Sequence, residues 1–275
     1  LSQVSVMAYF LSLIILGICC YIMSVNAIRP LKDAYFKQRQ LIADASHEIK
    51  TPITVVSANL ELIASDPTAS VESNKRWIDS SQYQIKRMSS LILQMLELSS
   101  IEEGKYFKNY EKINVSQICF GVVLSFEAVA FEKNIDIKSD IQDGLIAKGN
   151  SIEFEKLVTT LLDNALKYTN SNGIITFELR KEGKKIVMSV VNTGEGISSE
   201  KIPYLFERFY KMDNAHQESG NSFGLGLSIA KTIAVNMKGD IECTSEVGKW
   251  TKFEVVLPYE REKARAKKQI NSDEV

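Results

Sequence analysis

Residues 43–52 read A-D-A-S-H-E-I-K-T-P, and this stretch decides how the N-terminal part of the chain folds. Apolar or small residues recur around it in steps of three and four, which predicts an amphipathic helix that packs on a partner through one stripe. The stripe consists of Leu31, Tyr35, Gln38, Ile42, Ala45, Ile49, Ile53, Val56, Leu60 and Ile63. At about 100° per residue, His47 lies roughly 160–200° from Ala45 and Ile49 around this helix, so its ring is expected to face solvent.

His47 is followed directly by Glu48, and the chain has only two histidines. An exposed histidine beside an acid is a candidate nucleophile, although an ordinary surface histidine on a two-helix hairpin has the same pattern. A zinc protease is excluded, because its motif needs a second histidine where Thr51 stands. The role of His47 therefore depends on the rest of the chain.

The composition bounds the class of protein. At 275 residues the chain is long enough for one large or two modest domains. Its net charge of −1 and its 24% of charged residues give no general basic field, so nucleic acid is not expected as a partner. Its four cysteines are too few and too scattered for a disulfide scaffold or a metal cluster, and we expect them to be reduced.

Residues 1–28 carry no charge and are predicted to form a transmembrane helix, since Val4 to Val25 is almost wholly apolar. A signal peptide would have a shorter apolar core and an earlier basic region. The first charges are Arg29, Lys32, Lys37 and Arg39, which predicts a cell-membrane protein whose remaining chain is cytoplasmic. Because the chain begins with Leu rather than Met, we expect further sequence upstream.

Residues 29–104 are predicted to form a helical hairpin. Pro30 separates it from the membrane segment but allows continuation at a first helical turn, and Pro52 should bend the helix expected over 31–64. After a turn at 65–70, a second helix is expected over 73–101, with one face made of Ile78, Ser81, Ile85, Met88, Ile92 and Met95. Each stripe stays half covered in one hairpin, so a homodimeric four-helix bundle is expected.

Residues 105–259 change to an alternation of short β runs and helices, which predicts an α+β layer with a sheet on one side and helices on the other. The expected strands lie at 135–139, 173–180, 185–191 and 251–257, and the expected helices at 114–133, 151–168 and 225–237. The tail at 260–275 is charged and expected to fray.

Three segments of this region suit phosphate chemistry. On the helix over 151–168, Asn164, Lys167 and Tyr168 share one face, where they can meet a metal ion, a phosphate and a base. Two glycines at 190–197 follow a strand and allow close backbone approach. A glycine-rich turn opens the helix at 223–231, whose free amides favour an anion. Each segment alone is more often a plain turn or a solvated helix face, and none matches a P-loop or a dinucleotide fingerprint.

The order of these motifs resembles that of the sensor histidine kinases over roughly residues 40 to 258. Residues 43–52 are similar to the H box, 160–168 to the N box, 192–196 and 224–227 to the two glycine boxes, and 205–211 to the F box. The resemblance implies a dimerisation hairpin followed by an α+β sandwich that binds ATP, of the Bergerat or GHKL type. The chain departs from the family at Thr160, usually asparagine, at Asn192, usually aspartate, and at Ser222, often glycine.

The resemblance implies ATP and Mg²⁺ as cofactors, with Asn164 as the metal ligand, Lys167 on the phosphates, and Asn192 and Gly196 on the adenine. A lid is implied over about 198–223. The cofactor-binding residues implied are Asn164, Lys167, Tyr168, Asn192, Gly194, Gly196, Arg208, Lys211, Gly224, Leu225, Gly226 and Leu227.

The resemblance also implies that His47 accepts the γ-phosphoryl group on one ring nitrogen, while Glu48 accepts a hydrogen bond from the other. The phosphoryl group would pass to an aspartate of a cognate response regulator, and Thr51 would hold a water that hydrolyses the regulator's phosphate. Two alternatives stay open at this point: a degenerate kinase that acts as a nucleotide-binding scaffold, and a GHKL-type ATPase.

Overall fold

The computed structural model describes residues 2–102, 110–212 and 223–260. The chain divides into two compact units, residues 1–88 and 89–275. The predicted charged tail, apart from its first residue, and the part of the predicted lid at 213–222, including Ser222, lie outside the described residues.

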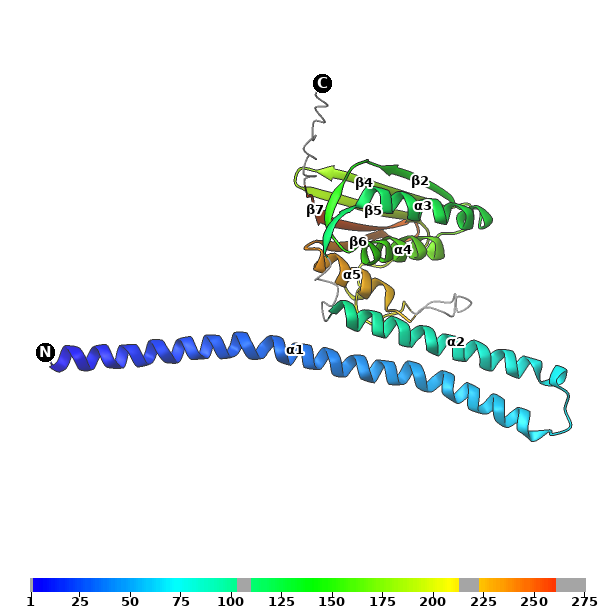
Figure 1. Cartoon of the computed structure of the whole chain (residues 1–275), viewed down its shortest axis with the longest axis horizontal. Coiled ribbons are helices and arrows are strands. Elements are labelled where there is room, and N and C mark those ends of the chain that lie inside the picture. The colour runs from blue at the N-terminus through cyan, green and yellow to red at the C-terminus, as the bar shows by residue number, and fades with distance from the viewer. Residues whose placement is uncertain (1, 103–109, 213–222, 261–275) are drawn as a thin grey trace, which may run out of the picture. The chain divides into compact units, whose positions relative to one another are not determined.

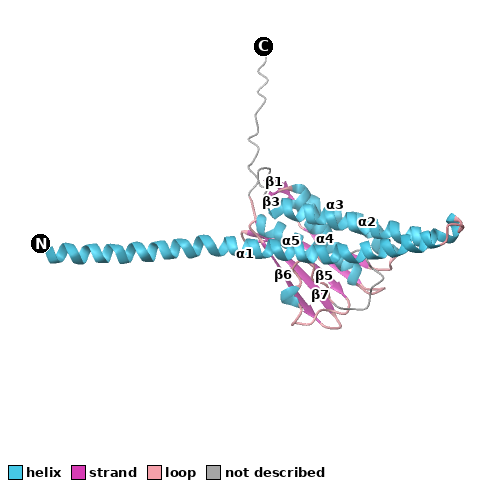
Figure 2. Ribbon diagram, turned by 90° about the horizontal axis from the view of Figure 1, so that it is seen from below, coloured by secondary structure: helices cyan, strands magenta, loops and turns pink. Residues whose placement is uncertain are grey.

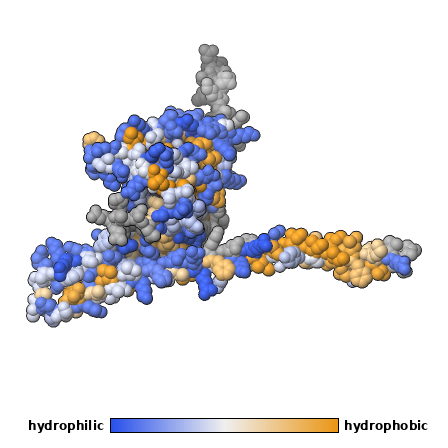
Figure 3. Space-filling model, turned by 180° about the vertical axis from the view of Figure 1, so that it is seen from behind, coloured by the Kyte–Doolittle hydropathy of each residue, from blue (hydrophilic) through white to orange (hydrophobic). Residues whose placement is uncertain are grey.

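The first unit begins with one long helix, α1 (Ser2–Ser65), which continues through Pro30 and Pro52 (Figure 1). A helix start near residue 31 is therefore wrong. A proline removes one backbone hydrogen bond, and the intact bonds on both sides of Pro30 keep the helix continuous. Within α1, Ser5–Asn26 is long and apolar enough to cross a membrane, and its exposed apolar side chains form the orange stretch of Figure 3. The bend expected at Pro52 stays a prediction.

Helix α2 (Val71–Glu102) follows a turn that Asp66 closes. Asp66 Oδ1 accepts hydrogen bonds from the Thr68 amide at 3.0 Å and from the Thr68 hydroxyl at 2.7 Å, and these bonds lower the pKa of the Asp66 carboxyl. On the hairpin, Asn59 Nδ2 donates to Ser80 Oγ at 3.0 Å and to Ser81 Oγ at 3.2 Å. The predicted helix over 73–101 is confirmed, and its true bounds are slightly wider.

The buried seam of α1 is narrower than the predicted stripe. Among the described side chains of α1, those buried are Ala45, Pro52 and Asn59, spaced seven residues apart. Ile53 and Leu60, which belong to the predicted stripe, remain about half exposed. A seven-residue repeat is what a helix buries against one partner helix, whereas the wider stripe needs more than one.

The second unit contains a five-stranded sheet in the order β2-β4-β5-β7-β6. Its strands are β2 (Asp136–Ile141), β4 (Ile174–Glu182), β5 (Lys185–Thr193), β6 (Asp240–Glu246) and β7 (Trp250–Pro258), and the β2–β4 pair is parallel while the others are antiparallel. A separate pair joins β1 (Glu111–Asn114) and β3 (Ile146–Gly149). The four predicted strands are confirmed, and β1, β3 and β6 were missed because they are short or rich in charged and polar residues.

Helices α3 (Val115–Glu132), α4 (Ser151–Tyr168) and α5 (Gly226–Asn236) cover one face of this sheet, and a short 3₁₀ helix spans Ile202–Tyr204 (Figures 1 and 2). The predicted α+β layer and its three helices are confirmed. Asn114 and Asn150 cap α3 and α4 by accepting hydrogen bonds from amides of the first turn. Although α3 is also apolar enough to cross a membrane, six of its residues are buried in this layer.

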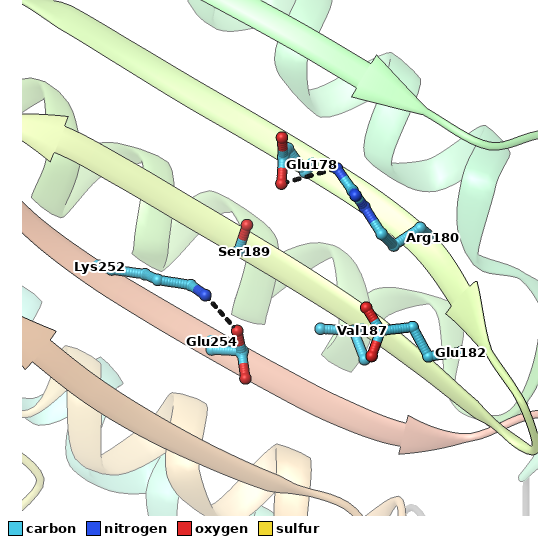
Figure 4. A pocket seen from close by; sticks show the side chains of 7 residues that line it. All are labelled: Glu178, Arg180, Glu182, Val187, Ser189, Lys252 and Glu254. Carbon is cyan, nitrogen blue, oxygen red and sulfur yellow. Dashed lines mark ion pairs between the residues drawn. The ribbon is translucent and has the colours of Figure 1, made fainter.

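The opposite face of the sheet is polar. A hollow of about 200 Å³ lies there, lined by Glu178, Arg180, Glu182, Val187, Ser189, Lys252 and Glu254 (Figure 4). Arg180 pairs with Glu178 at 2.9 Å, and Lys252 pairs with Glu254. None of the predicted site residues lines this hollow, so the candidate site must be built from the helix-covered side and the loops at its edge.

Candidate functional site

His47 and Thr51 are both exposed on α1, one helical turn apart, as the periodicity predicts for His47. Glu48 is partly buried and forms an ion pair with Arg87 of α2, with Arg87 Nη2 lying 3.8 Å from Glu48 Oε2. Adjacent residues on a helix do not face each other, so the orientation of the Glu48 carboxylate is set by α2 rather than by His47. Arg87 was missed by the sequence analysis, because its pairing joins positions 39 residues apart.

The end of α4 presents the three predicted residues on one side. Asn164 is half-buried, and its amide makes no hydrogen bond with the part of the chain that the structure describes. Lys167 Nζ lies 5.1 Å from the centre of the Tyr168 ring, and Tyr168 is 43% exposed. An amide oxygen, an ammonium group and an aromatic face are therefore available together at the C-terminal end of α4.

The loop after β5 lies against this end of α4. A Cβ at Gly194 would overlap the carbonyl oxygen of Tyr168, so only glycine allows the backbone so close. Gly196 adopts a φ of +68°, and a Cβ there would overlap the Glu246 carbonyl. The Gly194 amide donates to the Lys249 carbonyl at 3.1 Å, which ties the loop to the β6–β7 turn. The structure therefore places the first glycine motif beside the Asn164 helix.

A row of polar side chains crosses the helix-covered face of the sheet next to this loop. Asn192 on β5 lies opposite Thr251 on β7, and Thr251 lies opposite Ser245 on β6. Asn192 and Thr251 are buried, with exposed fractions of 3% and 6%. Asn192 Nδ2 donates to the Thr193 carbonyl at 3.2 Å. Neighbouring strands thus bring together three polar groups where the apolar face ends.

The hydrogen-bond directions in this row are set by Ser245. Its hydroxyl donates to the Trp250 carbonyl at 2.6 Å and accepts from the Ile197 amide at 2.8 Å. Because its single proton is already used, the 2.9 Å contact between Ser245 and Thr251 must be donated by Thr251. Thr251 therefore keeps only acceptor capacity. Thr251 and Ser245 were missed, although strand alternation could have placed Thr251 on the inward face.

The second glycine motif opens α5. Gly224 has a φ of +72°, and its carbonyl accepts from the Phe209 amide at 3.0 Å. The N-cap of α5 is Leu225, which makes no side-chain capping hydrogen bond, so the first amides and the helix dipole are available to an anion. Gly226 faces α4, because a Cβ there would lie 3.2 Å from the Thr160 methyl group. Leu227 lies in the first turn of α5 and is half-buried.

Arg208 and Lys211 lie in the segment that leads toward this turn. Lys211 Nζ lies 6.0 Å from the centre of the Phe223 ring, so this cation stays next to the start of the glycine motif. The hydrogen bond between Phe209 and Gly224 joins the same segment to the motif. The Lys211 side chain therefore lies beside the glycine motif that opens α5, and Arg208 belongs to the same segment.

The donor set at the end of α4 could supply one ligand, the Asn164 amide oxygen, to a metal ion that takes its other ligands from a bound molecule. The part of the chain that the structure describes holds no cluster of three or more His, Cys, Asp or Glu residues able to bind a metal ion. Mg²⁺ commonly takes one or two protein ligands and completes its shell with phosphates and water. The Asn164 amide oxygen can serve as such a ligand, because no hydrogen bond of the described residues uses it.

Two family models match the chain. Residues 37–104 match the His Kinase A (phospho-acceptor) domain, which includes His47. Residues 149–261 match the histidine kinase-, DNA gyrase B-, and HSP90-like ATPase, which includes α4, both glycine motifs and the polar row. The two matches thus cover the two regions where the candidate residues lie.

Similar curated proteins are sensor kinases. The sensor protein DltS of Streptococcus agalactiae is 34% identical over 231 residues, which cover 84% of this chain and 57% of DltS. The sensor histidine kinase RppB of Synechocystis is 30% identical over 234 residues, which cover 84% of this chain and 51% of RppB. The chain spans little more than half the length of these relatives.

Solved structures show the same fold. The histidine kinase AdeS of Acinetobacter baumannii aligns with a TM-score of 0.61 and 22% identity, covering 78% of this chain and 98% of that chain. The histidine kinase ThkA, solved in complex with the response regulator protein TrrA, aligns with a TM-score of 0.61 and 21% identity, covering 80% of this chain and 61% of that chain.

Proposed function

Because this chain belongs to the sensor histidine kinases of two-component systems, we propose that it transfers the γ-phosphoryl group of ATP to His47 and from there to an aspartate of a response regulator. The observation that carries this proposal is the exposed His47 within the matched phosphoacceptor segment. A matched ATPase segment with two closely packed glycine motifs in the same chain supports it.

In the first step, a ring nitrogen of His47 attacks the γ-phosphorus, the bond to the oxygen that bridges the β- and γ-phosphates breaks, and ADP leaves. Phosphoryl transfer depends on positioning and charge neutralisation. Asn164 would hold Mg²⁺, which neutralises charge on the phosphates. Lys167 and the uncapped amides of α5 would bind phosphate oxygens, and the polar row at Asn192 would receive the adenine. Glu48 would accept the proton on the other ring nitrogen of His47, after its carboxylate leaves Arg87.

We assign the opposing activity, hydrolysis of the regulator's phosphoaspartate, to Thr51. Its hydroxyl is exposed one turn after His47, where it can hold a water against a phosphoaspartate docked on this face. Pro52 lies next to Thr51 and is buried in the hairpin seam. A change in hairpin packing would therefore alter both the kinase activity at His47 and the phosphatase activity at Thr51.

We further propose that two hairpins form a four-helix bundle. One hairpin leaves Ile42, Ile53 and Leu60 of α1 and Ile85 of α2 about half exposed, and a second copy would cover them. The same dimer would be held at the cell membrane by Ser5–Asn26, with the basic residues from Arg29 onward placing the catalytic part in the cytoplasm.

The test is incubation of the full chain with γ-labelled ATP and Mg²⁺. Autophosphorylation predicts a label that is stable to base and lost in acid, and that disappears in His47→Gln. The control is His216→Gln, which removes the other histidine of the chain and should retain the acid-labile label. Nucleotide binding with no label in the unmodified protein would show a scaffold rather than a kinase, and a label that survives His47→Gln would refute the assignment of the histidine.

A further inference from the structure

The buried residue Asn192 gives the proposed nucleotide site an unusual hydrogen-bonding capacity. Its amide carries both a donor group and an acceptor oxygen, whereas a carboxylate at the same position only accepts. The structure holds the amide with Nδ2 donating to the Thr193 carbonyl at 3.2 Å. No hydrogen bond of the described residues uses its oxygen, although the residue is only 3% exposed. In this orientation Asn192 presents an acceptor to a nucleobase.

Adenine and the 6-oxopurines (guanine and hypoxanthine) differ in the hydrogen-bonding groups that they carry at positions 1 and 6. Adenine carries an amino group at position 6, which donates, and an unprotonated nitrogen at position 1. Guanine and hypoxanthine carry an oxygen at position 6, which accepts, and an N–H at position 1. An amide matches adenine in the orientation observed. Turned by 180° about its last torsion, the same amide matches a 6-oxopurine through the same pair of atoms.

Resting on the proposed function, we infer that the site binds 6-oxopurine nucleoside triphosphates as well as ATP, with Asn192 as the residue that sets the selectivity. The preference for adenine is modest. Turning the amide gives up the hydrogen bond to Thr193 and points Oδ1 at the same carbonyl oxygen, so the side chain must also rotate away from it. The loss of one neutral hydrogen bond of this kind corresponds to a factor of about ten in affinity. Thr251 adds to the preference for adenine, because its proton is used by Ser245 and it can only accept.

Aspartate in place of Asn192 should sharpen the selectivity. A carboxylate cannot donate to the oxygen of a 6-oxopurine and repels it in a buried row. A polar mismatch of this kind rejects a ligand by about 100-fold or more. Inosine triphosphate is the right probe, because it differs from ATP only at positions 6 and 1 and lacks the extra amino group of guanine. Any discrimination then reports hydrogen-bond polarity rather than the size of the base.

The experiment measures displacement of a fluorescent trinitrophenyl-ATP from the full chain in detergent, with Mg²⁺, by ATP and by inosine triphosphate. The ratio of their dissociation constants should be about ten or less for the unmodified protein and about 100 or more for Asn192→Asp. Asn192→Ser, whose hydroxyl both donates and accepts, should keep the ratio near that of the unmodified protein. Asn150→Asp is the matched control, since it makes the same change at the opposite end of α4, where aspartate also caps a helix.

The outcomes separate this inference from the proposed function. A ratio of about 100 or more in the unmodified protein overturns the inference even if Asn192→Asp does not fold, while the ATP site itself stands. An equal ratio in the unmodified protein and in Asn192→Asp also overturns it. If ATP does not displace the probe at all, the proposed function fails together with the inference.

Discussion

Tyr110→Phe tests how the chain is held just before strand β1, within the second unit. Tyr110 Oη donates to Glu153 Oε2 at 2.7 Å, and Glu153 is 5% exposed in the first turn of α4. Its other oxygen, Oε1, is buried and has no hydrogen-bond partner among the described residues. A hydrogen bond to a carboxylate contributes about 1.5–3 kcal/mol, so the free energy of unfolding should fall by that amount at pH 7.5.

The pKa of Glu153 determines whether removing its charge stabilises or destabilises the fold at a given pH. Burial raises the pKa of Glu153 above the ordinary value of 4.5, while the hydrogen bond from Tyr110 opposes that shift. A carboxyl group with a raised pKa in the folded state contributes stability that is present below its unfolded pKa and lost as pH rises through its folded pKa. Glu153→Gln should therefore stabilise the domain at pH 7.5, and this gain should vanish as pH falls toward 4.5.

The assay is urea unfolding of residues 29–275 carrying Trp77→Phe, so that Trp250, the other tryptophan, reports on this unit alone. In the Glu153→Gln background, Tyr110→Phe removes a neutral hydrogen bond, and its cost should drop to about 1 kcal/mol. The reasoning is refuted if Tyr110→Phe lowers the free energy of unfolding equally in the unmodified protein and in Glu153→Gln. It is also refuted if Glu153→Gln stabilises the domain by an amount that does not change with pH.

Three further predictions concern the sites themselves. Gly194→Ala should weaken ATP binding more than tenfold in the displacement assay, since its Cβ would overlap a carbonyl of α4, whereas Gly121→Ala, with open space around it, should change nothing. Arg87→Ala should cost under about 1 kcal/mol of stability, because the pair is partly exposed, and should speed labelling by up to about fivefold by releasing Glu48; a slower rate contradicts this. Asn59→Ala should destabilise the hairpin by about 1–3 kcal/mol in thermal unfolding, because the Ser80 and Ser81 hydroxyls lose the donor that Asn59 supplies. An unchanged Tm would count against that.

Local patterns explain which elements were predictable. Helix α4 and strand β5 combine a clear periodicity with clear ends, and their predicted positions are confirmed. Strand β6 (Asp240–Glu246) alternates exposed polar residues with the inward-facing Ile241, Cys243 and Ser245, of which only Ile241 is strongly apolar, so the pattern is too weak to predict the strand without its pairing to β7. The start of α1 was misplaced for a related reason, since a proline costs one hydrogen bond and does not by itself decide whether a helix continues.

The sequence by itself determined the exposure of His47 and the set of motifs on which the proposed nucleotide site rests, because both follow from spacing along one chain segment. Only the tertiary structure decided that Glu48 lies against Arg87 and that Asn192, Thr251 and Ser245 form one polar row. The direction of the hydrogen bonds in that row also depends on the fold. Contacts between residues far apart in the chain are set by strand pairing and helix packing, and the spacing of residues along the chain does not encode them directly.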